Sequence, residues 1–193
     1  MRLIRTAFIT LALMAVVTGA LYPLAMTAVA QLLFSGQANG SLVVRNGRLA
    51  GSTLIGQQFQ QPGYFWGRLS ATSPLPYRAA ASSGSNFGPL SADMQAAARQ
   101  RLERLRAADP DAAEAVPVDL VTSSGSGLDP HISPAAAYYQ ARRVARSRGL
   151  PLDLVRALIE SHTEGRSLGF LGEPRVNVLL LNLALDEGAT PPQ

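Results

Sequence analysis

The sequence predicts an α+β protein, in which a single N-terminal transmembrane helix is followed by one mixed α/β extracytoplasmic domain. Three observations lead to this fold class. The chain begins with a long apolar stretch that carries almost no charge, an Asn-Gly pair then lies between short apolar runs, and the second half places proline and glycine at opposite ends of amphipathic segments. These patterns are typical of a membrane span, a β-hairpin and bracketed helices.

The transmembrane helix is expected over residues 6–34, where 29 residues contain no charge. A bilayer core needs about 20 helical residues, so this segment is long enough to span it. The alternative is a cleavable signal peptide, because Ala28-Val29-Ala30 resembles a cleavage site. The apolar region of a signal peptide is only about 7–15 residues long, which favours a retained anchor.

Charge predicts the orientation of this span. Arg2 and Arg5 precede it, and the next charge is Arg45. The positive-inside rule therefore places residues 1–5 in the cytoplasm and residues 35–193 outside.

Three residues of the span are candidates for helix contacts in the membrane. Pro23 should kink the helix, and Ala15 and Gly19 have the spacing of small residues that lets a second helix approach closely. The alternative for the two small residues is that alanine and glycine are common in membrane helices.

The extracytoplasmic domain should begin with strands. Asn46-Gly47 lies between apolar runs within residues 41–59 and predicts a type I′ hairpin. Residues 64–70 (YFWGRLS) and 115–122 (AVPVDLVT) are predicted as two further short strands.

Amphipathic helices are expected to interleave with these strands. Residues 94–109 place apolar side chains on one face and arginines on the other. Ser133 is the expected N-cap of a helix over residues 134–149, and proline and glycine bracket residues 151–165 in the same way. Residues 173–188 read as a helix or a buried strand, and their length favours the helix.

Composition argues against several kinds of site. The basic residues are all arginine, so the Walker A pattern, which requires lysine, is missing. The sequence has no cysteine and two histidines, so we expect no metal site and no directly bound cofactor. His162 and Glu164 do not form the H-E-x-x-H zinc motif, and His162 is expected to cap a helix end near Gly165. The net charge of +4 is modest, which indicates no nucleic-acid partner.

Residues 123–134 (SSGSGLDPHISP) contain the side chains of a hydrolase triad, Ser126, Asp129 and His131. The spacing is wrong for a nucleophile elbow, G-x-S-x-G, because Ser126 lies directly between two glycines. A hydrogen bond between Asp129 and His131 is not expected, because they are so close in sequence and Pro130 stiffens the link. We therefore interpret the stretch as a rigid loop that docks on a partner. Its pattern SSGSxxxP also occurs at residues 82–89, again ahead of an amphipathic helix.

The backbone N–H groups of this loop suggest anion binding as an alternative, because they precede a helix N-terminus. Arginines of that helix would add positive charge: Arg142, Arg143, Arg146 and Arg148. The preferred interpretation is that they form a solvated face near the C-terminal end of the helix, where the helix dipole favours cations.

The order of motifs resembles a known family over essentially the whole chain. A span ending in Tyr22-Pro23 precedes GSTLIGQQF, YFWGRLSA, SSGSNFGP, VPVDLVTSSGSGLDPHISPAAA, Gln140 with RRVA, HTEG and GFLGEPRVNVLLLNLALD. This order resembles the C subunit of the bacterial high-affinity potassium-transporting P-type ATPase, the Kdp complex. Its most specific parts are SGSGLDPHISP and GFLGEPRVNVL.

The resemblance implies an accessory, non-catalytic subunit with one pass through the bacterial inner membrane and a periplasmic domain. Its partners would be a channel-like potassium-translocating subunit, a P-type ATPase subunit and a small single-span subunit, within the lipid bilayer. It would support assembly and act as a catalytic chaperone that raises the affinity of the ATPase subunit for ATP. The resemblance also links Gln140 to nucleotide binding. Because that residue is expected outside the cytoplasm, we expect any effect on ATP to act through the complex, by allostery.

Nine residues are candidates for partner docking: Ser126, Gly127, Asp129, His131, Ser133, His162, Glu164, Glu173 and Arg175. No residue is expected to be catalytic. One alternative is a membrane-anchored periplasmic hydrolase that uses Ser126 and His131. Another is a subunit that binds ATP directly, which would require a cytoplasmic domain.

Overall fold

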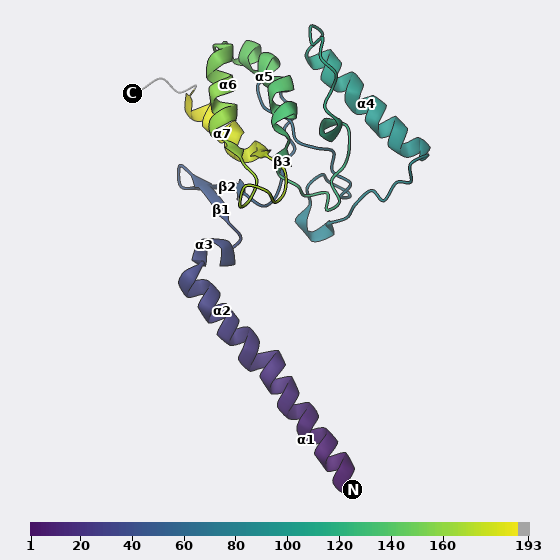
Figure 1. Ribbon diagram of the computed structural model, residues 1–193, viewed down its shortest axis with the longest axis vertical. Helices are drawn as coiled ribbons and strands as arrows, with labels where there is room; N and C mark the ends of the chain where they lie inside the picture. The colour runs from purple at the N-terminus through teal and green to yellow at the C-terminus, as the bar shows by residue number, and fades with distance from the viewer. Residues whose placement is uncertain (189–193) are drawn as a thin grey trace. The chain divides into compact units, whose positions relative to one another are not determined.

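The computed structural model describes residues 1–188, which divide into two compact units at Ser52–Thr53. Figure 1 shows the helices and strands of each unit in chain order. The fold is mixed helix and sheet with one long apolar N-terminal helix, as predicted. The last five residues of the expected extracytoplasmic domain lie outside the described residues.

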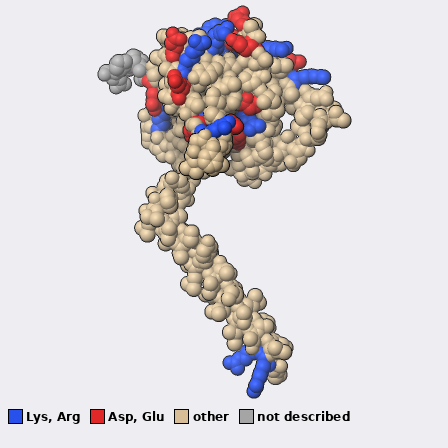
Figure 2. Space-filling view, in the orientation of Figure 1, with Lys and Arg blue, Asp and Glu red and all other residues tan. Residues whose placement is uncertain are grey.

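The first unit consists mainly of one helix, Arg2–Leu33, formed by α1 (Arg2–Val16), a π-helical turn η1 (Val17–Leu21) and α2 (Tyr22–Leu33). An 18-residue window of this helix has a mean hydropathy of 2.0 and no buried residue. In Figure 2 its surface is uncharged along most of its length, with basic side chains at the N-terminal end. The helix is long and apolar enough to be a single membrane span.

The π-helical turn lies directly ahead of Pro23. Proline lacks an N–H group, and its ring collides with the carbonyl four residues earlier, which here belongs to Gly19. Gly19 lies within η1, where the wider turn accommodates that collision and the helix continues. Ala15 lies in α1, one turn earlier.

The rest of the first unit is a short helix α3 (Ser35–Ala38) and an antiparallel hairpin of β1 (Leu42–Arg45) and β2 (Arg48–Ser52). Asn46 and Gly47 have φ values of 50° and 72°, as the two central residues of a type I′ turn require. The predicted hairpin is confirmed.

In the second unit, three helices pack around a shared core: α5 (Pro134–Arg148), α6 (Leu152–Ser161) and α7 (Val178–Gly188). The core is built from buried aliphatic side chains, among them Val144, Val155, Ile159, Leu181 and Leu185. Figure 1 shows α4 (Ala92–Ala108) apart from these three helices, and only one of its residues, Leu105, is fully buried.

A small antiparallel sheet supports the three helices, with the strand order β3-β5-β4. Its strands are β3 (His131–Ile132), β4 (Thr163–Glu164) and β5 (Arg175–Asn177). His131 lies opposite Asn177, and Glu164 lies opposite Arg175. The sheet therefore joins the loop that ends at residue 133 to the hairpin between α6 and α7.

Helix boundaries agree with most of the predicted signals. Ser133 caps α5 by accepting the Ala136 N–H at 3.0 Å, and Gly149 ends this helix with φ 65°. The helix predicted over residues 151–165 ends earlier, at Ser161, because residues 163–164 pair with β5 instead. The segment 173–188 is a helix only from residue 178, after the short strand β5.

The predictions of strands at residues 64–70 and 115–122 are both wrong. In the first segment only Leu69 forms a β-bridge, to Ser123, and the other residues belong to no helix or strand. The second contains a 3₁₀ turn, η3 (Val118–Leu120), which follows Pro117. A further 3₁₀ turn, η2, covers Ala79–Ala81.

Candidate functional site

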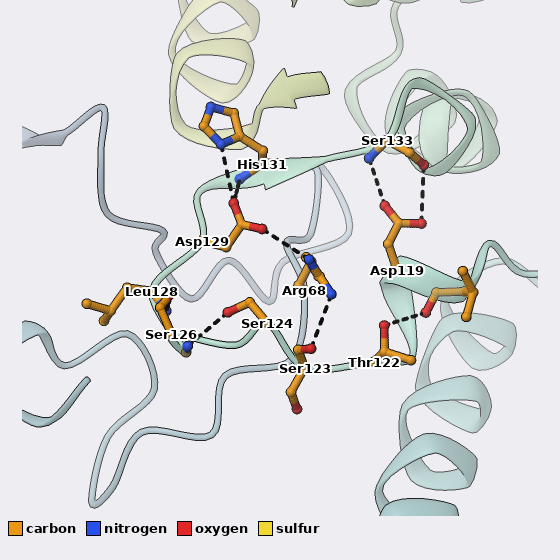
Figure 3. A network of polar contacts seen from close by, with 12 residues as sticks. Arg68, Asp119, Thr122, Ser123, Ser124, Ser126, Leu128, Asp129, His131 and Ser133 are labelled. Carbon is orange, nitrogen blue, oxygen red and sulfur yellow. Dashed lines mark hydrogen bonds and ion pairs between the residues drawn. The ribbon is translucent and has the colours of Figure 1, made fainter. Parts of the chain in front are cut away.

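The serine-glycine loop, residues 123–133, is organised around the carboxylate of Asp129 (Figure 3). Its Oδ1 accepts the backbone N–H of His131 at 3.0 Å and contacts His131 Nδ1 at 3.3 Å. Its Oδ2 accepts from Arg68 Nη1 at 3.1 Å. The expectation that Asp129 and His131 share no hydrogen bond is wrong, because the backbone N–H and the ring nitrogen of His131 both lie within hydrogen-bond distance of the same carboxylate oxygen.

The environment of Asp129 stabilises its charged form. Burial acts to raise the pKa of this carboxyl, but the hydrogen bonds from His131 and Arg68 outweigh that effect and lower it below 3.8. The side chain is 29% exposed and forms an ion pair with Arg68. Asp129 is therefore a fixed negative charge that holds the loop together.

The serine and glycine residues hold the loop in one conformation. Ser124 Oγ accepts the Gly127 N–H at 2.9 Å, and Ser126 Oγ accepts the Leu128 N–H at 3.1 Å. Ser70 Oγ donates to the Gly127 carbonyl at 2.6 Å. Gly127 has φ 69°, and a Cβ at this position would lie 2.7 Å from the Ser83 carbonyl oxygen.

The two SSGS segments lie against each other. Ser83 N and Ser82 Oγ both donate to the carbonyl oxygen of Ser126, each at 3.0 Å. The hydroxyl of Ser126 is bonded to the backbone of its own loop, and His131 contacts Asp129. The three residues therefore do not form the Ser–His–Asp chain that a hydrolase uses.

Ser133 connects the loop to Asp119 as well as to α5. The backbone N–H of Ser133 donates to Asp119 Oδ2 at 2.7 Å, and its hydroxyl donates to Asp119 Oδ1 at 3.2 Å. Figure 3 shows this pair beside the Asp129 cluster. The loop is thus fastened to the start of the helix that follows it.

Gln140 lies inside the core, and only 1% of it is exposed. Its Oε1 accepts the Trp66 N–H at 2.9 Å, and its Nε2 donates to the Trp66 carbonyl at 3.1 Å. Asn182 holds Phe65 in the same way, at 2.8 and 3.0 Å. These two side-chain amides pair with the backbone N–H and C=O groups of Phe65 and Trp66, which belong to no sheet.

The prediction of a solvated arginine face is correct for Arg142 and Arg146, which are about half exposed and form ion pairs with acidic side chains. It is wrong for Arg143, which is 2% exposed, and for Arg148, which is mostly buried. The backbone carbonyls of residues 62–64 have no strand partner, and these two guanidinium groups donate to them.

Arg143 also stacks on Trp66, with 4.4 Å between the guanidinium carbon and the ring centroid, and donates to Gln140 Oε1 at 2.7 Å. Burial lowers the pKa of Arg143 to about 10. The guanidinium is still protonated at neutral pH. Its charged N–H groups donate to the backbone carbonyls of Pro62 and Tyr64 and so fix that loop.

A cavity of about 680 Å³ lies between residues 57–62, residues 66–70 and α4. Arg68, Arg101 and Arg104 line it, and its described lining contains no Asp or Glu. Burial lowers the pKa of Arg101, whose guanidinium carbon lies over the Trp66 ring, 5.2 Å from its centroid. The cavity suits an anionic or carbonyl-bearing group better than a cation.

The other docking candidates lie at the β4–β5 hairpin. Glu164 forms an ion pair with Arg175 at 2.9 Å, and Glu173 forms one with Arg166 at 2.7 Å. His162 is the C-cap of α6, and its Nδ1 contacts the Leu158 carbonyl at 2.9 Å, as expected for a helix end. Within residues 1–188, no group of three or more His, Asp or Glu side chains is placed to hold a metal ion.

Sequence reasoning missed several residues that organise the site: Trp66, Arg68, Asp119, Arg166 and Asn182. One of them had a visible signal. Asn182 is a lone amide within the apolar run LLLNLAL, and a buried amide requires hydrogen-bond partners. Trp66, Arg68 and Asp119 bond to residues 14 to 74 positions away in the chain, which no local pattern indicates. Arg166 pairs with Glu173, seven residues later, across a hairpin that the sequence analysis does not predict.

Comparisons with known proteins give one consistent result. A family model described as K⁺-transporting ATPase, c chain (KdpC), matches residues 4–187. The potassium-transporting ATPase KdpC subunit of Variovorax paradoxus (strain S110) is 62% identical over 186 residues, 96% of this chain and 96% of that protein. Proteins with the same name from Herpetosiphon aurantiacus and Sorangium cellulosum are 58% and 60% identical, and they cover 95% of this chain and 95% and 96% of their own lengths.

Proposed function

The chain belongs to the KdpC family, the c chains of K⁺-transporting ATPases, and from that premise we propose that it is a non-catalytic subunit that assembles such a pump. Its partners are the channel-like potassium-translocating subunit, the P-type ATPase subunit and the small single-span subunit. The alternative of a periplasmic hydrolase is not adopted, because the Ser126 hydroxyl bonds within its own loop.

The observation that carries this proposal is the unburied helix Arg2–Leu33. A helix that is apolar on all sides requires lipid or other helices around it. In our proposal this helix spans the inner membrane with its N-terminus in the cytoplasm, and the second unit lies in the periplasm. The span contacts partner helices, and Ala15, Gly19 and Pro23 lie where such contacts form.

The proposal is tested by purifying the detergent-solubilised complex through a tag on this chain and identifying what accompanies it. The three pump subunits should be recovered with the wild-type chain. They should be lost when residues 6–34 are replaced by a polyleucine anchor of equal length. Recovery of the tagged chain alone would contradict the proposal.

Orientation is tested with a single introduced cysteine, since the natural chain has none. Leu90→Cys is suitable, because Leu90 is 92% exposed. A membrane-impermeant maleimide added to spheroplasts should label it without lysis. A cysteine at position 140 would be unsuitable because that position is buried.

We also propose that the subunit raises the apparent affinity of the pump for ATP through contacts with the ATPase subunit, without binding nucleotide. Gln140 supports this, because its amide is fully engaged inside the core. A complex that lacks this chain should therefore show a higher KM for ATP. Photolabelling of this chain by an azido-ATP analogue within the intact complex would contradict indirect action.

A further inference from the structure

The cavity of about 680 Å³ beside α4 has a positively charged lining that the proposed function does not use. Its volume lies within the range of small-molecule sites, about 300–1,000 Å³. The guanidinium groups of Arg68, Arg101 and Arg104 line it, and none of the lining residues within residues 1–188 is Asp or Glu. The cavity is therefore large enough for an organic molecule and has the charge to hold an anion.

Two of these three arginine charges have no acidic partner. Arg68 forms an ion pair with Asp129 at 3.1 Å. Arg101 instead donates to two neutral backbone carbonyls, at 3.1 and 2.7 Å. Arg104 is exposed, and it has no hydrogen bond or ion pair with any residue that the structure describes. The lining thus carries two positive charges that no carboxylate of the described chain balances.

The electrostatics of the lining show the same imbalance. Burial is the main cause of the lowered pKa of Arg101, and the positive charge of Arg104 lowers it further. Tyr77 also lines the cavity, but burial raises its pKa to about 12, so its phenol is neutral at pH 7 and supplies no counter-charge. An anion in the cavity would relieve the repulsion between the two arginines.

The rest of the lining indicates which anion fits. Phe59, Trp66 and Tyr77 provide aromatic walls for an apolar group. The arginines come from the C-terminal half of α4, where the helix dipole disfavours a multiply charged anion. Phosphate sites typically use the opposite end of a helix, with its free backbone N–H groups. A carboxylate carries one charge, and the guanidinium fork matches its two oxygens.

We propose that this cavity binds a small organic carboxylate. The carboxylate bonds to Arg101 and Arg104, and the apolar part of the molecule packs against the aromatic side chains. Arg68 contributes a further donor, because its Nε is buried and has no hydrogen-bond partner among the described residues. This binding site is additional to the role in assembly and does not depend on it.

The test uses benzoate as the probe and the full-length chain in a neutral detergent. Trp66 reports occupancy directly, because it is the single tryptophan and lines the cavity. At constant ionic strength, benzoate should change the emission of Trp66 saturably and raise the urea midpoint of unfolding. Inorganic phosphate should bind more weakly than benzoate, and chloride should give no saturable change.

Two variants of α4 separate a specific contact from a general effect of charge. Arg104→Gln should weaken benzoate binding at least about tenfold, as expected when a charge-assisted hydrogen bond is lost. Arg99→Gln is the matched control, because it removes the same charge from an exposed position that does not line the cavity. It should weaken binding by less than about twofold, since a distant surface charge is screened by salt. Without benzoate, both variants should keep the wild-type urea midpoint, because both side chains are exposed.

Three results would overturn the inference. Equal weakening by the two variants would show a general effect of charge. Phosphate binding as tight as that of benzoate would contradict a carboxylate site. The absence of any saturable change in emission and of any rise in the midpoint would show that the cavity does not bind carboxylates. Purification of the complex tests the proposed function separately, so either conclusion can fail while the other stands.

Discussion

The side chain of Gln140 bonds to both main-chain groups of Trp66, accepting its N–H at 2.9 Å and donating to its carbonyl at 3.1 Å. Residue 140 lies on a helix, whereas Trp66 lies 74 residues earlier in a segment that belongs to no helix or strand. One side chain thus makes the two hydrogen bonds with the Trp66 backbone that a neighbouring strand would make in a sheet.

Gln140→Leu should reduce the free energy of unfolding by about 3 kcal/mol, because it leaves two buried backbone groups without partners. Gln140→Glu is the control. It keeps the acceptor for Trp66 N–H and for Arg143, so we expect a smaller loss. Urea unfolding of the full chain in detergent, followed by emission of Trp66, the single tryptophan, measures both. Equal stabilities of both variants and the wild type would show that the hydrogen bonds between Gln140 and Trp66 do not contribute to stability.

The neighbouring glycines 125 and 127 should respond very differently to alanine. Gly127 has φ 69°, and its Cβ would lie 2.7 Å from the Ser83 carbonyl oxygen, whereas nothing lies within 4 Å of a Cβ at Gly125. Gly127→Ala should therefore destabilise the domain by about 2–3 kcal/mol, from the left-handed backbone together with the collision. Gly125→Ala should change stability by less than about 0.5 kcal/mol. The urea midpoints of the two variants are compared with that of the wild type. A similar loss of stability in both variants would contradict the prediction.

The contribution of Asp129 to stability should depend on pH. Because its pKa is lowered below 3.8 in the folded state, the folded chain binds this proton less readily than the unfolded chain does. The stabilisation is therefore present above pH 3.8 and disappears as the pH falls through the folded pKa. Asp129→Asn should be less stable than the wild type at pH 7, and the difference should shrink below pH 4. Urea midpoints of both proteins from pH 7 to pH 2.5 measure this, and a constant difference would count against the ion pair with Arg68.

Ser133→Ala should reduce stability by about 1–2 kcal/mol, because it removes the cap of α5 and the hydroxyl bond to Asp119. Ser91→Ala is the matched control at the start of α4. That cap bond is longer, at 3.3 Å, and its helix contributes one buried residue, so a smaller loss is expected. Thermal unfolding monitored by circular dichroism compares the two. If Ser91→Ala were the more damaging substitution, the bond to Asp119 would have little importance.

Local signals predicted those parts of the fold that depend on local chemistry. Asn46-Gly47 sets the hairpin turn through positive φ values, and Ser133 with Gly149 sets the two ends of α5. The apolar N-terminal helix follows from a single uninterrupted stretch. In each case the residues that determine the element lie within it or directly beside it in the sequence.

The errors arise where the partners are distant. Residues 64–70 have the composition of a strand, but their backbone bonds to amides on two helices. The position of Arg143 near a helix end predicts a solvated side chain, yet it is buried and donates to carbonyls about 80 residues earlier in the chain. Glu164, Glu173 and Arg175 are candidates from the sequence, but their ion pairs form only when β4 and β5 are paired.

The π-helical turn ahead of Pro23 has a consequence for the directions in which the long helix presents its side chains. A turn that contains one additional residue shifts the helical phase of everything after it by roughly 100° relative to an uninterrupted α-helix. A line of side chains that runs along α1 therefore does not continue along α2. One continuous helix thus carries two differently oriented faces, and different neighbours can contact its two halves.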